Sequence, residues 1–339
     1  MKIKKKFIVS IDQGTTSSRA ILFNKTGKLI YSSQKEFTQY FPKDGWVEHN
    51  PNDIWRTTNK VLKDVIYKAN QLKGEILTIG IANQRETTVL WNKKSGKKIY
   101  NAIVWQDRRT AEFCKKFKTK KKEKLIKKKT GLLIDPYFSS TKIKWILDNV
   151  PKAKKLARKN LLAFGTIDTF LIWKLTGGKV HATDATNACR TMLFNISTSK
   201  WDKEILKIFN IPFNILPEIK NSSDNFGFTL KSITGKPIPI NGVVGDQQAA
   251  TIGNACFSKG SVKSTYGTGA FVLINTGNKK VFSKNKLLTT ICYRLNGKNT
   301  YALEGSIFIA GAGLQWLRDK IKLIKSVKDK EKIIKSLKN

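Results

Sequence analysis

The stretch of residues 8–23 (IVSIDQGTTSSRAILF) carries residue types suited to holding phosphate. Two apolar runs flank a turn of glycine, hydroxyl residues and arginine, which is typical of a β-hairpin with a polar tip. Gly14 lets the backbone approach closely, the hydroxyl and N–H groups donate hydrogen bonds, and Arg19 adds a fixed positive charge. Asp12 ends the first run, where its carboxylate is placed to hold a divalent cation. An ordinary hairpin with a polar turn is the alternative that this stretch leaves open.

A second glycine–threonine turn, residues 266–269 (YGTG), lies far along the chain. It repeats the opening pattern of strand, polar turn, strand and further strands, here predicted over residues 261–265, 271–275, 288–294 and 300–304. The repeat predicts two related domains, each with a hairpin tip, and two tips facing across a cleft would grip the phosphates of one nucleotide. A helix-opening segment, residues 310–315 (AGAGLQ), follows, as expected where a helix N-terminus approaches phosphate.

The remaining elements follow from hydrophobic periodicity and from capping signals. We predict further strands over residues 28–37, 76–82, 87–91, 102–105 and 238–244. We predict helices over residues 51–70, 115–129, 141–148, 152–159, 168–175, 249–252 and 319–339. Residues 183–192 are polar and are predicted to form a turn-like segment. Asp168 and Asp184 lie near predicted helix starts, and we interpret both as helix caps.

The 339-residue chain is long enough for two domains and is strongly basic, since 64 Lys and Arg against 24 Asp and Glu give a net charge of +40. Such a charge is compatible with nucleic acid or an anionic membrane as partner. The densest lysine run, residues 115–129, is typical of a solvated helix and lacks the repeated aromatic residues of a base-stacking surface. We therefore expect only weak, non-specific binding to polyanions at low salt.

The four cysteines are isolated and the chain has only two histidines, so its sequence offers no zinc-binding pattern. Buried free thiols in a reducing cytosol fit this usage, and we expect a cytoplasmic protein. The basic opening residues lack the apolar run of a signal peptide, because Asp12 interrupts it. No apolar run reaches the roughly 18 residues that a membrane span needs.

Ten collinear blocks resemble the FGGY family of carbohydrate kinases, and the NQRETT and WVEH blocks resemble the glycerol kinases within that family. The blocks are SIDQGTTSSRA, GWVEHNP, NQRETT, NAIVWQDRRT, GLLIDPYFSSTKIKWILDN, FGTIDTFLIWKLTGG, TDATNACRTMLFNI, GDQQAA, STYGTGAFVLINTG and YALEGSIFIAGAGLQWLRD. The resemblance implies an α/β, actin-like ATPase (ribonuclease H-like) fold. It also implies ATP-dependent phosphorylation of glycerol to sn-glycerol 3-phosphate, with ATP and Mg²⁺ as cofactors.

The resemblance implies a role for each motif residue. Asp12 is the implied Mg²⁺ contact, and Asp246 is the implied general base. The implied ATP and phosphate contacts are Thr15, Thr16, Ser17, Arg19, Thr268, Gly311 and Gln315. The implied glycerol ligands are Arg85, Glu86, Tyr137, Asp246 and Gln247, with Trp105 and Phe271 as apolar walls. A triol needs several donors and acceptors at once, which these side chains provide.

Members of the resembled family continue well past position 339. We therefore expect a complete first domain over residues 1–252 and an incomplete second domain over residues 253–339, with an apolar face or strand edge exposed on the second sheet. Two alternatives stay open. One is a truncated, weakly active or inactive remnant that still binds glycerol or phosphate, and the other is a basic nucleic-acid-binding protein. Expected partners are glycerol and ATP, with no specific nucleic acid; homo-oligomerisation is left open.

Overall fold

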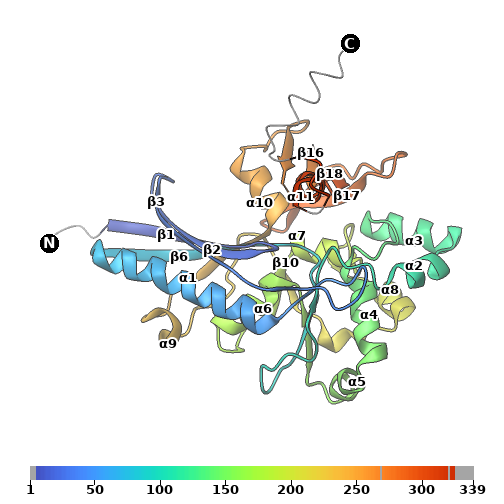
Figure 1. Cartoon of the computed structure of the whole chain (residues 1–339), viewed down its shortest axis with the longest axis horizontal. Helices are drawn as coiled ribbons and strands as arrows, with labels where there is room; N and C mark the ends of the chain where they lie inside the picture. Colours follow the sequence, from blue (N-terminus) through green and yellow to red (C-terminus); the bar gives the residue numbers. More distant parts are fainter. Residues whose placement is uncertain (1–4, 268, 320, 325–339) are drawn as a thin grey trace, which may run out of the picture.

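The structure, a computed structural model, describes residues 5–267, 269–319 and 321–324, without the side chains of Ala312 and Gln315. The two largest β-sheets of this part of the chain, with five and four strands, are joined by a group of helices (Figure 1). The strands are β1 Lys5–Gln13, β2 Ser17–Asn24, β3 Leu29–Glu36, β4 Gln39–Tyr40, β5 Glu48–His49, β6 Gly74–Asn83, β7 Val89–Asn92, β8 Ala102–Ile103, β9 Leu162–Gly165, β10 Ala182–Asp184, β11 Phe194–Asn195, β12 Lys200–Trp201, β13 Glu218–Lys220, β14 Ile240–Gly245, β15 Val262–Tyr266, β16 Ala270–Gly277, β17 Leu288–Leu295 and β18 Lys298–Ile307.

The helices run from α1 to α11, with two short 3₁₀ turns, η1 and η2, between them. They are α1 Pro51–Gln71, α2 Ala111–Phe117, α3 Lys120–Thr130, α4 Ser139–Asn149, α5 Pro151–Arg158, α6 Ile167–Leu175, α7 Ala185–Ala188, η1 Cys189–Thr191, α8 Lys203–Phe209, η2 Phe213–Ile215, α9 Lys231–Thr234, α10 Asp246–Gly253 and α11 Gly311–Asp319. The repeated antiparallel strands predicted for the second half of the chain are therefore present.

The first sheet has the order β14-β6-β1-β2-β3. Strands β14, β6 and β1 are parallel, and their register places Val244, Ala82 and Asp12 side by side. Because these three strands end at the same edge, the segments that follow each of them come together there. Those segments are the tip of the β1–β2 hairpin, the turn after β6 and the start of α10, and each carries predicted site residues.

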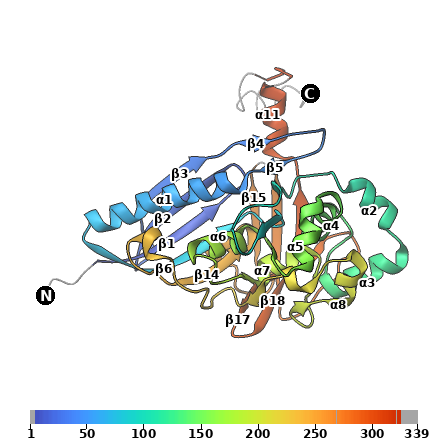
Figure 2. The same ribbon diagram turned by 90° about the horizontal axis from the view of Figure 1, so that it is seen from below.

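Helix α1 covers one face of this sheet and fixes its position (Figure 2). Asn50 caps the helix by accepting a hydrogen bond from the N–H of Asn52, and proline follows at the first helical position. Apolar residues at helical spacing, including Ile54, Val61 and Val65, are buried in the same core as Val9. Each such side chain contributes about 1.5–3 kcal/mol of burial free energy.

The second sheet has the order β15-β16-β18-β17 and is antiparallel throughout. Phe271, Leu288 and Tyr301 from its strands share one apolar core with Ile143 and Phe164 from the helical region. The second sheet is therefore packed against the helical region that lies between β6 and β14 in the chain, and this packing determines where the β15–β16 hairpin tip lies.

Apolar side chains are exposed around the second sheet, as the sequence predicts. Tyr266 is 82% exposed, Ile307 62% and Ile309 71%. A hollow of about 580 Å³ lies on this sheet and is lined mainly by apolar side chains, among them Val272 and Leu303.

The structure corrects two predictions about the helical region. The single lysine-rich helix predicted over residues 115–129 is two helices, α2 and α3, because Thr119 adopts an extended backbone and accepts a hydrogen bond from the N–H of Lys122, which starts a new helix. Residues 183–192, predicted as a turn-like segment, form buried short elements instead, in which Asp184 caps α7 by accepting hydrogen bonds from Thr186 and Asn187.

The prediction that Asp184 is a helix cap is thus confirmed, whereas Asp168 is not a cap. Its buried carboxylate lies inside the first turn of α6 and accepts hydrogen bonds from the hydroxyls of Thr166 and Thr183. The helix predicted over residues 319–339 lies largely outside the described residues, and α11 ends at Asp319.

The four cysteines are buried and free, which confirms the predicted thiols. Within the described part of the chain, no cluster of three metal-binding side chains occurs. The helices of that same part include none long and apolar enough to cross a bilayer.

Candidate active site

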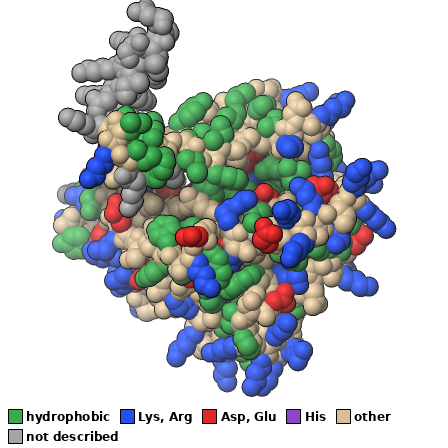
Figure 3. Space-filling view, turned by 45° about the vertical axis from the view of Figure 1, so that its right-hand side comes forward, with side chains coloured by type: hydrophobic (Ala, Val, Ile, Leu, Met, Phe, Trp, Pro, Cys, Tyr) green, Lys and Arg blue, Asp and Glu red, His purple; other side chains and the backbone are tan. Residues whose placement is uncertain are grey.

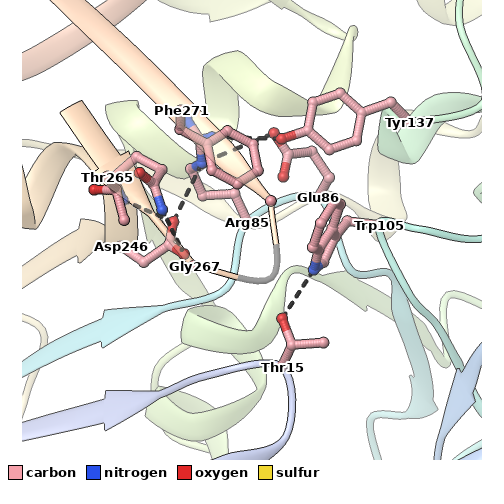
Figure 4. A pocket seen from close by; sticks show the side chains of 11 residues that line it. Thr15, Arg85, Glu86, Trp105, Tyr137, Asp246, Thr265, Gly267 and Phe271 are labelled. Carbon is pink, nitrogen blue, oxygen red and sulfur yellow. Dashed lines mark hydrogen bonds and ion pairs between the residues drawn. The ribbon is translucent and has the colours of Figure 1, made fainter. Parts of the chain in front are cut away.

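A pocket of about 130 Å³ lies where the strand ends of the first sheet meet the hairpin tip of the second (Figure 4). This volume is below the roughly 300–1,000 Å³ of sites for drug-sized ligands, so the pocket suits a molecule of few atoms. It is lined by Thr15, Arg85, Glu86, Trp105, Tyr137, Asp246, Gln247, Thr265, Gly267, Gly269 and Phe271.

Arg85 is the residue with the most polar contacts in the pocket. It follows β6 and is 2% exposed. Its Nη1 and Nη2 atoms donate to the two carboxylate oxygens of Glu304 at 2.6 and 3.0 Å, and its Nε lies 3.3 Å from an oxygen of Asp246. Such a bidentate pair fixes the plane of the guanidinium group. Gly245 is required beside it, because a Cβ there would lie 2.7 Å from Cδ of Arg85.

Glu86 adopts a left-handed backbone conformation with a φ of 62°. A non-glycine residue in this region costs of order 1–3 kcal/mol and is typical of functional sites. The resulting tight turn, in which the N–H of Thr87 donates to the carbonyl of Arg85 at 2.7 Å, directs both charged side chains into the pocket. Burial raises the pKa of Glu86, and the nearby Arg85 and Arg190 oppose that rise.

Arg190 and Glu304 were not among the predicted site residues, although both are fully buried beside the pocket. Nε of Arg190 donates to Glu86 at 2.6 Å and its Nη2 donates to Glu304 at 2.9 Å. Burial alone would raise the pKa of Glu304, but Arg190 and Arg85 outweigh it and lower the pKa to about 2. No local sequence signal marks either residue as part of a site, because Arg190 lies in a polar stretch and Glu304 is one charge among mostly apolar residues.

Asp246 begins α10 directly after β14, and its side chain remains 35% exposed toward the pocket. Burial raises the pKa of Asp246 above its ordinary value, and the charge of Arg85 opposes this rise. Nζ of Lys263, a buried residue on β15, donates to the amide oxygen of Gln247 at 2.6 Å. The amide nitrogen of Gln247 then donates to Asp246 at 3.2 Å, so Lys263 fixes which way the Gln247 amide points.

Aromatic side chains form the apolar wall of the pocket. The ring of Trp105 meets those of Tyr137 and Phe271 edge to face, with both centroid distances at 5.9 Å. The indole N–H of Trp105 donates to the hydroxyl of Thr15 at 2.9 Å, which ties this wall to the first hairpin tip. The buried ammonium group of Lys142 donates to the backbone carbonyl of Tyr137 at 2.5 Å and holds the loop that carries it.

The two glycine-containing hairpin tips both reach this pocket, through Thr15 on one side and Gly267 and Gly269 on the other. The N–H of Gly311, the first residue of α11, donates to the carbonyl of Gly267 at 2.9 Å. The N-terminus of α11 therefore adjoins the second tip, an arrangement that favours anions.

Every predicted glycerol ligand and wall residue lines the pocket, and so does Thr15. Asp12 and Arg19 lie on the β1–β2 hairpin, where they form an ion pair at 2.6 Å, and the hairpin also carries Thr16 and Ser17. Thr268 lies outside the described residues, although its neighbours line the pocket. Gln315 belongs to α11, but its side chain is not described. The individual roles of all these residues stay predictions.

Comparison with known families and structures agrees with this geometry. Residues 7–253 match the N-terminal domain of the FGGY family of carbohydrate kinases, and residues 262–339 match the C-terminal domain of that family. The chain therefore belongs to the FGGY family of carbohydrate kinases and has its actin-like ATPase fold, as the sequence motifs predict. The domain division at residue 252 itself remains a proposal.

Similar curated proteins are the glycerol kinases of Petrotoga mobilis, 57% identical over 96% of this chain, and of Rhizobium meliloti, 58% identical over 95%. The chain spans 65% of the length of each of these relatives. The crystal structure of Plasmodium falciparum glycerol kinase with ADP matches 99% of this chain and 67% of that one, with a TM-score of 0.92 and 41% identity. Gluconate kinase from Lactobacillus acidophilus, at 22% identity and a TM-score of 0.81, shares the fold.

Proposed function

We propose that this chain binds glycerol and ATP and transfers the γ-phosphoryl group to a glycerol hydroxyl, giving sn-glycerol 3-phosphate and ADP. The observation that supports this most is the convergence of Arg85, Glu86, Tyr137, Asp246 and Gln247 in one small pocket with an aromatic wall. The high identity to curated glycerol kinases supports the same substrate.

The polar side chains suit a polyol because they offer donors and acceptors together. The carboxylates of Glu86 and Asp246 accept hydrogen bonds from hydroxyl groups, while Arg85 and the amide of Gln247 donate to hydroxyl oxygens. The rings of Trp105 and Phe271 cover the carbon atoms and exclude water. A pocket of about 130 Å³ leaves little room for a larger sugar to make such contacts.

Asp246 would act as general base. As the glycerol hydroxyl oxygen bonds to the γ-phosphorus, the hydroxyl proton passes to the Asp246 carboxylate and the bond from that phosphorus to the β–γ bridging oxygen breaks, so ADP leaves. A raised pKa suits this role because it makes the carboxylate a stronger proton acceptor. Thr15 and the backbone of the two tips would bind the phosphates, as would the N-terminus of α11.

Mg²⁺ would lie near Asp12, whose carboxylate is 32% exposed and is the acidic group at the first hairpin tip. One carboxylate suffices for this ion, because Mg²⁺ usually combines one or two carboxylates with phosphates and waters. When bound, the ion would neutralise phosphate charge. Arg19, now paired with Asp12, would be free to turn to the phosphates.

The test is glycerol-dependent release of ADP by the purified chain and by its Asp246→Asn variant. Loss of a general base lowers turnover by about 10²–10⁴-fold, and we expect that loss with glycerol affinity changed less than tenfold. Asp148→Asn, which alters an exposed carboxylate on α4, is the matched control and should keep wild-type turnover.

Glycerol binding without turnover in the wild-type chain would refute the proposed reaction and favour the binding remnant. Folded protein that neither binds glycerol nor releases ADP with it would refute the substrate as well.

A further inference from the structure

Four buried charged side chains form a closed ring behind the pocket. Arg85 donates to Glu304, Glu304 accepts from Arg190, Arg190 donates to Glu86, and Glu86 lies 3.9 Å from Arg85. Each of the four is at most 2% exposed. Positive and negative groups alternate around the ring, so its formal charges cancel.

The ring members come from three separate parts of the chain. Arg85 and Glu86 belong to the turn after β6, Arg190 to the η1 segment, and Glu304 to β18 of the second sheet. We propose that Arg190 and Glu304 are positioning residues for the polyol pocket: Glu304 orients the guanidinium group of Arg85, and Arg190 orients the carboxylate of Glu86. This inference rests on the proposed function of the pocket.

The contacts of Glu86 show what Arg190 achieves. Arg190 engages Oε1 of Glu86, whereas Oε2 accepts no hydrogen bond from the residues that the structure describes. One oxygen is thus held and the other stays available to a hydroxyl group in the pocket. The guanidinium group of Arg190 also packs 5.5 Å from the ring centroid of Tyr137, so the same residue supports a second pocket wall.

Glu304 orients Arg85 in a similar way. Its two oxygens take Nη1 and Nη2 of Arg85, so the remaining edge of the guanidinium group, Nε, is directed toward Asp246 at 3.3 Å. Ser306 donates to Glu304 at 3.1 Å and helps to fix the carboxylate. The negative charge that holds Arg85, which follows a strand of the first sheet, therefore comes from Glu304 on the second sheet.

Buried ion pairs are weak stabilisers compared with apolar packing of similar volume, which favours a role of this ring in orienting side chains over a role in stability.

The experiment compares glycerol binding, measured by calorimetry, in wild type, Glu304→Gln, and the double variant Glu304→Gln/Arg190→Gln. The double variant removes one positive and one negative charge, so Arg85 and Glu86 remain a neutral pair. We expect it to unfold closer to the wild-type temperature than the single variant does, but to bind glycerol at least tenfold more weakly. Glu48→Gln, at a buried ion pair with Arg109 away from the pocket, should bind glycerol as wild type does.

A second measurement tests whether the charge of Glu304 acts on Asp246 in the pocket. Arg85, Glu304 and Lys263 are the charged groups that face Asp246. Removing the negative charge of Glu304 should lower the pKa of Asp246, which a ¹³C NMR titration of its carboxyl carbon would show in Glu304→Gln and not in Glu48→Gln.

The outcomes distinguish the two proposals. A folded double variant that binds glycerol with wild-type affinity overturns the positioning role and leaves the proposed function intact. A folded wild-type chain that binds no glycerol overturns both.

Discussion

Single residues in this protein place ionisable groups at positions that water does not reach. Asp168 is the clearest case outside the pocket, because it has no cationic partner among the residues described and accepts hydrogen bonds only from uncharged groups. Burial raises its pKa from 3.8 to about 7, against the opposing effect of the hydroxyls of Thr166 and Thr183. Its protonation should therefore be visible in the stability of the whole protein.

We expect the free energy of unfolding of the Asp168→Asn variant to increase relative to that of the wild type as pH rises from about 4.5 to 7.5. Between the two pKa values the folded state binds a proton that the unfolded state lacks, so wild-type stability falls as pH rises through this window. The shift of roughly three pKa units corresponds to about 4 kcal/mol at most. Urea unfolding at a series of pH values measures it.

Asp202→Asn is the control, since the pKa of Asp202 is lowered, with Asn195 and Lys129 among the groups that outweigh its burial. The difference in free energy of unfolding between Asp202→Asn and the wild type should stay constant above pH 5. A constant offset for Asp168→Asn over the same range would contradict the prediction.

The residue scale also shows where sequence reasoning fails. The motif residues around the pocket could be predicted because their types and order match a family pattern. Arg190, Glu304, Lys142 and Lys263 could not, because nothing local marks a lysine or glutamate as buried. Their burial depends on partners that are far away in the chain: Arg85 and Glu304, for example, are 219 positions apart.

At the scale of elements, prediction succeeded where periodicity and capping agree. The limits of α1, predicted as 51–70, are observed as Pro51–Gln71, because a capping asparagine, a proline and an apolar stripe all indicate the same helix. The break between α2 and α3 was missed, since lysine periodicity continues across it and Thr119 is its only marker. Residues 183–192 were predicted as turn-like but form β10, α7 and η1, because their polar side chains are satisfied by hydrogen bonds within the core.

The end of α3 is the element whose geometry is most constrained. Gly131 caps the helix with a φ of 77°, and a Cβ there would lie 2.2 Å from the backbone oxygen of Thr289 in the second sheet. The N–H of Thr289 also donates to the carbonyl of Gly131 at 2.9 Å. This close approach joins the lysine-rich helix to β17.

We expect Gly131→Ala to destabilise the protein by more than about 2 kcal/mol, because left-handed strain of roughly 1 kcal/mol adds to a clash with backbone. Gly235→Ala is the matched control: Gly235 has a φ of 78° but no atom near its missing Cβ, so only the strain should be measured. Equal losses for the two variants in thermal unfolding would show that the contact with Thr289 does not matter.

At the scale of the whole molecule, the net charge of +40 is the most unusual property. Lys and Arg side chains are spread over the visible face in Figure 3 and alternate there with apolar and uncharged groups. Such a surface attracts polyanions at long range. The lysine-rich run over residues 115–129 lacks the repeated aromatic residues with which proteins bind single-stranded nucleic acid.

We expect the protein to bind duplex DNA at about 25 mM salt and to lose at least tenfold in affinity by about 150 mM, because the Debye length then falls to about 8 Å. Fluorescence anisotropy with two unrelated sequences measures this, and both should behave alike. Sequence-dependent DNA binding that persists at about 150 mM salt would contradict this expectation and support nucleic acid as a specific partner.

The charge ring links the part of the chain before residue 252 to the second sheet. Glu304 belongs to β18, whereas both arginines that it neutralises belong to the part of the chain before residue 252. A polypeptide containing only that earlier part would keep Arg85, Arg190 and Glu86 but not Glu304, so the remaining ring residues would carry a net positive charge. The charge balance beside the pocket therefore depends on both sheets, because Glu304 of the second sheet supplies one of the two negative charges in the ring.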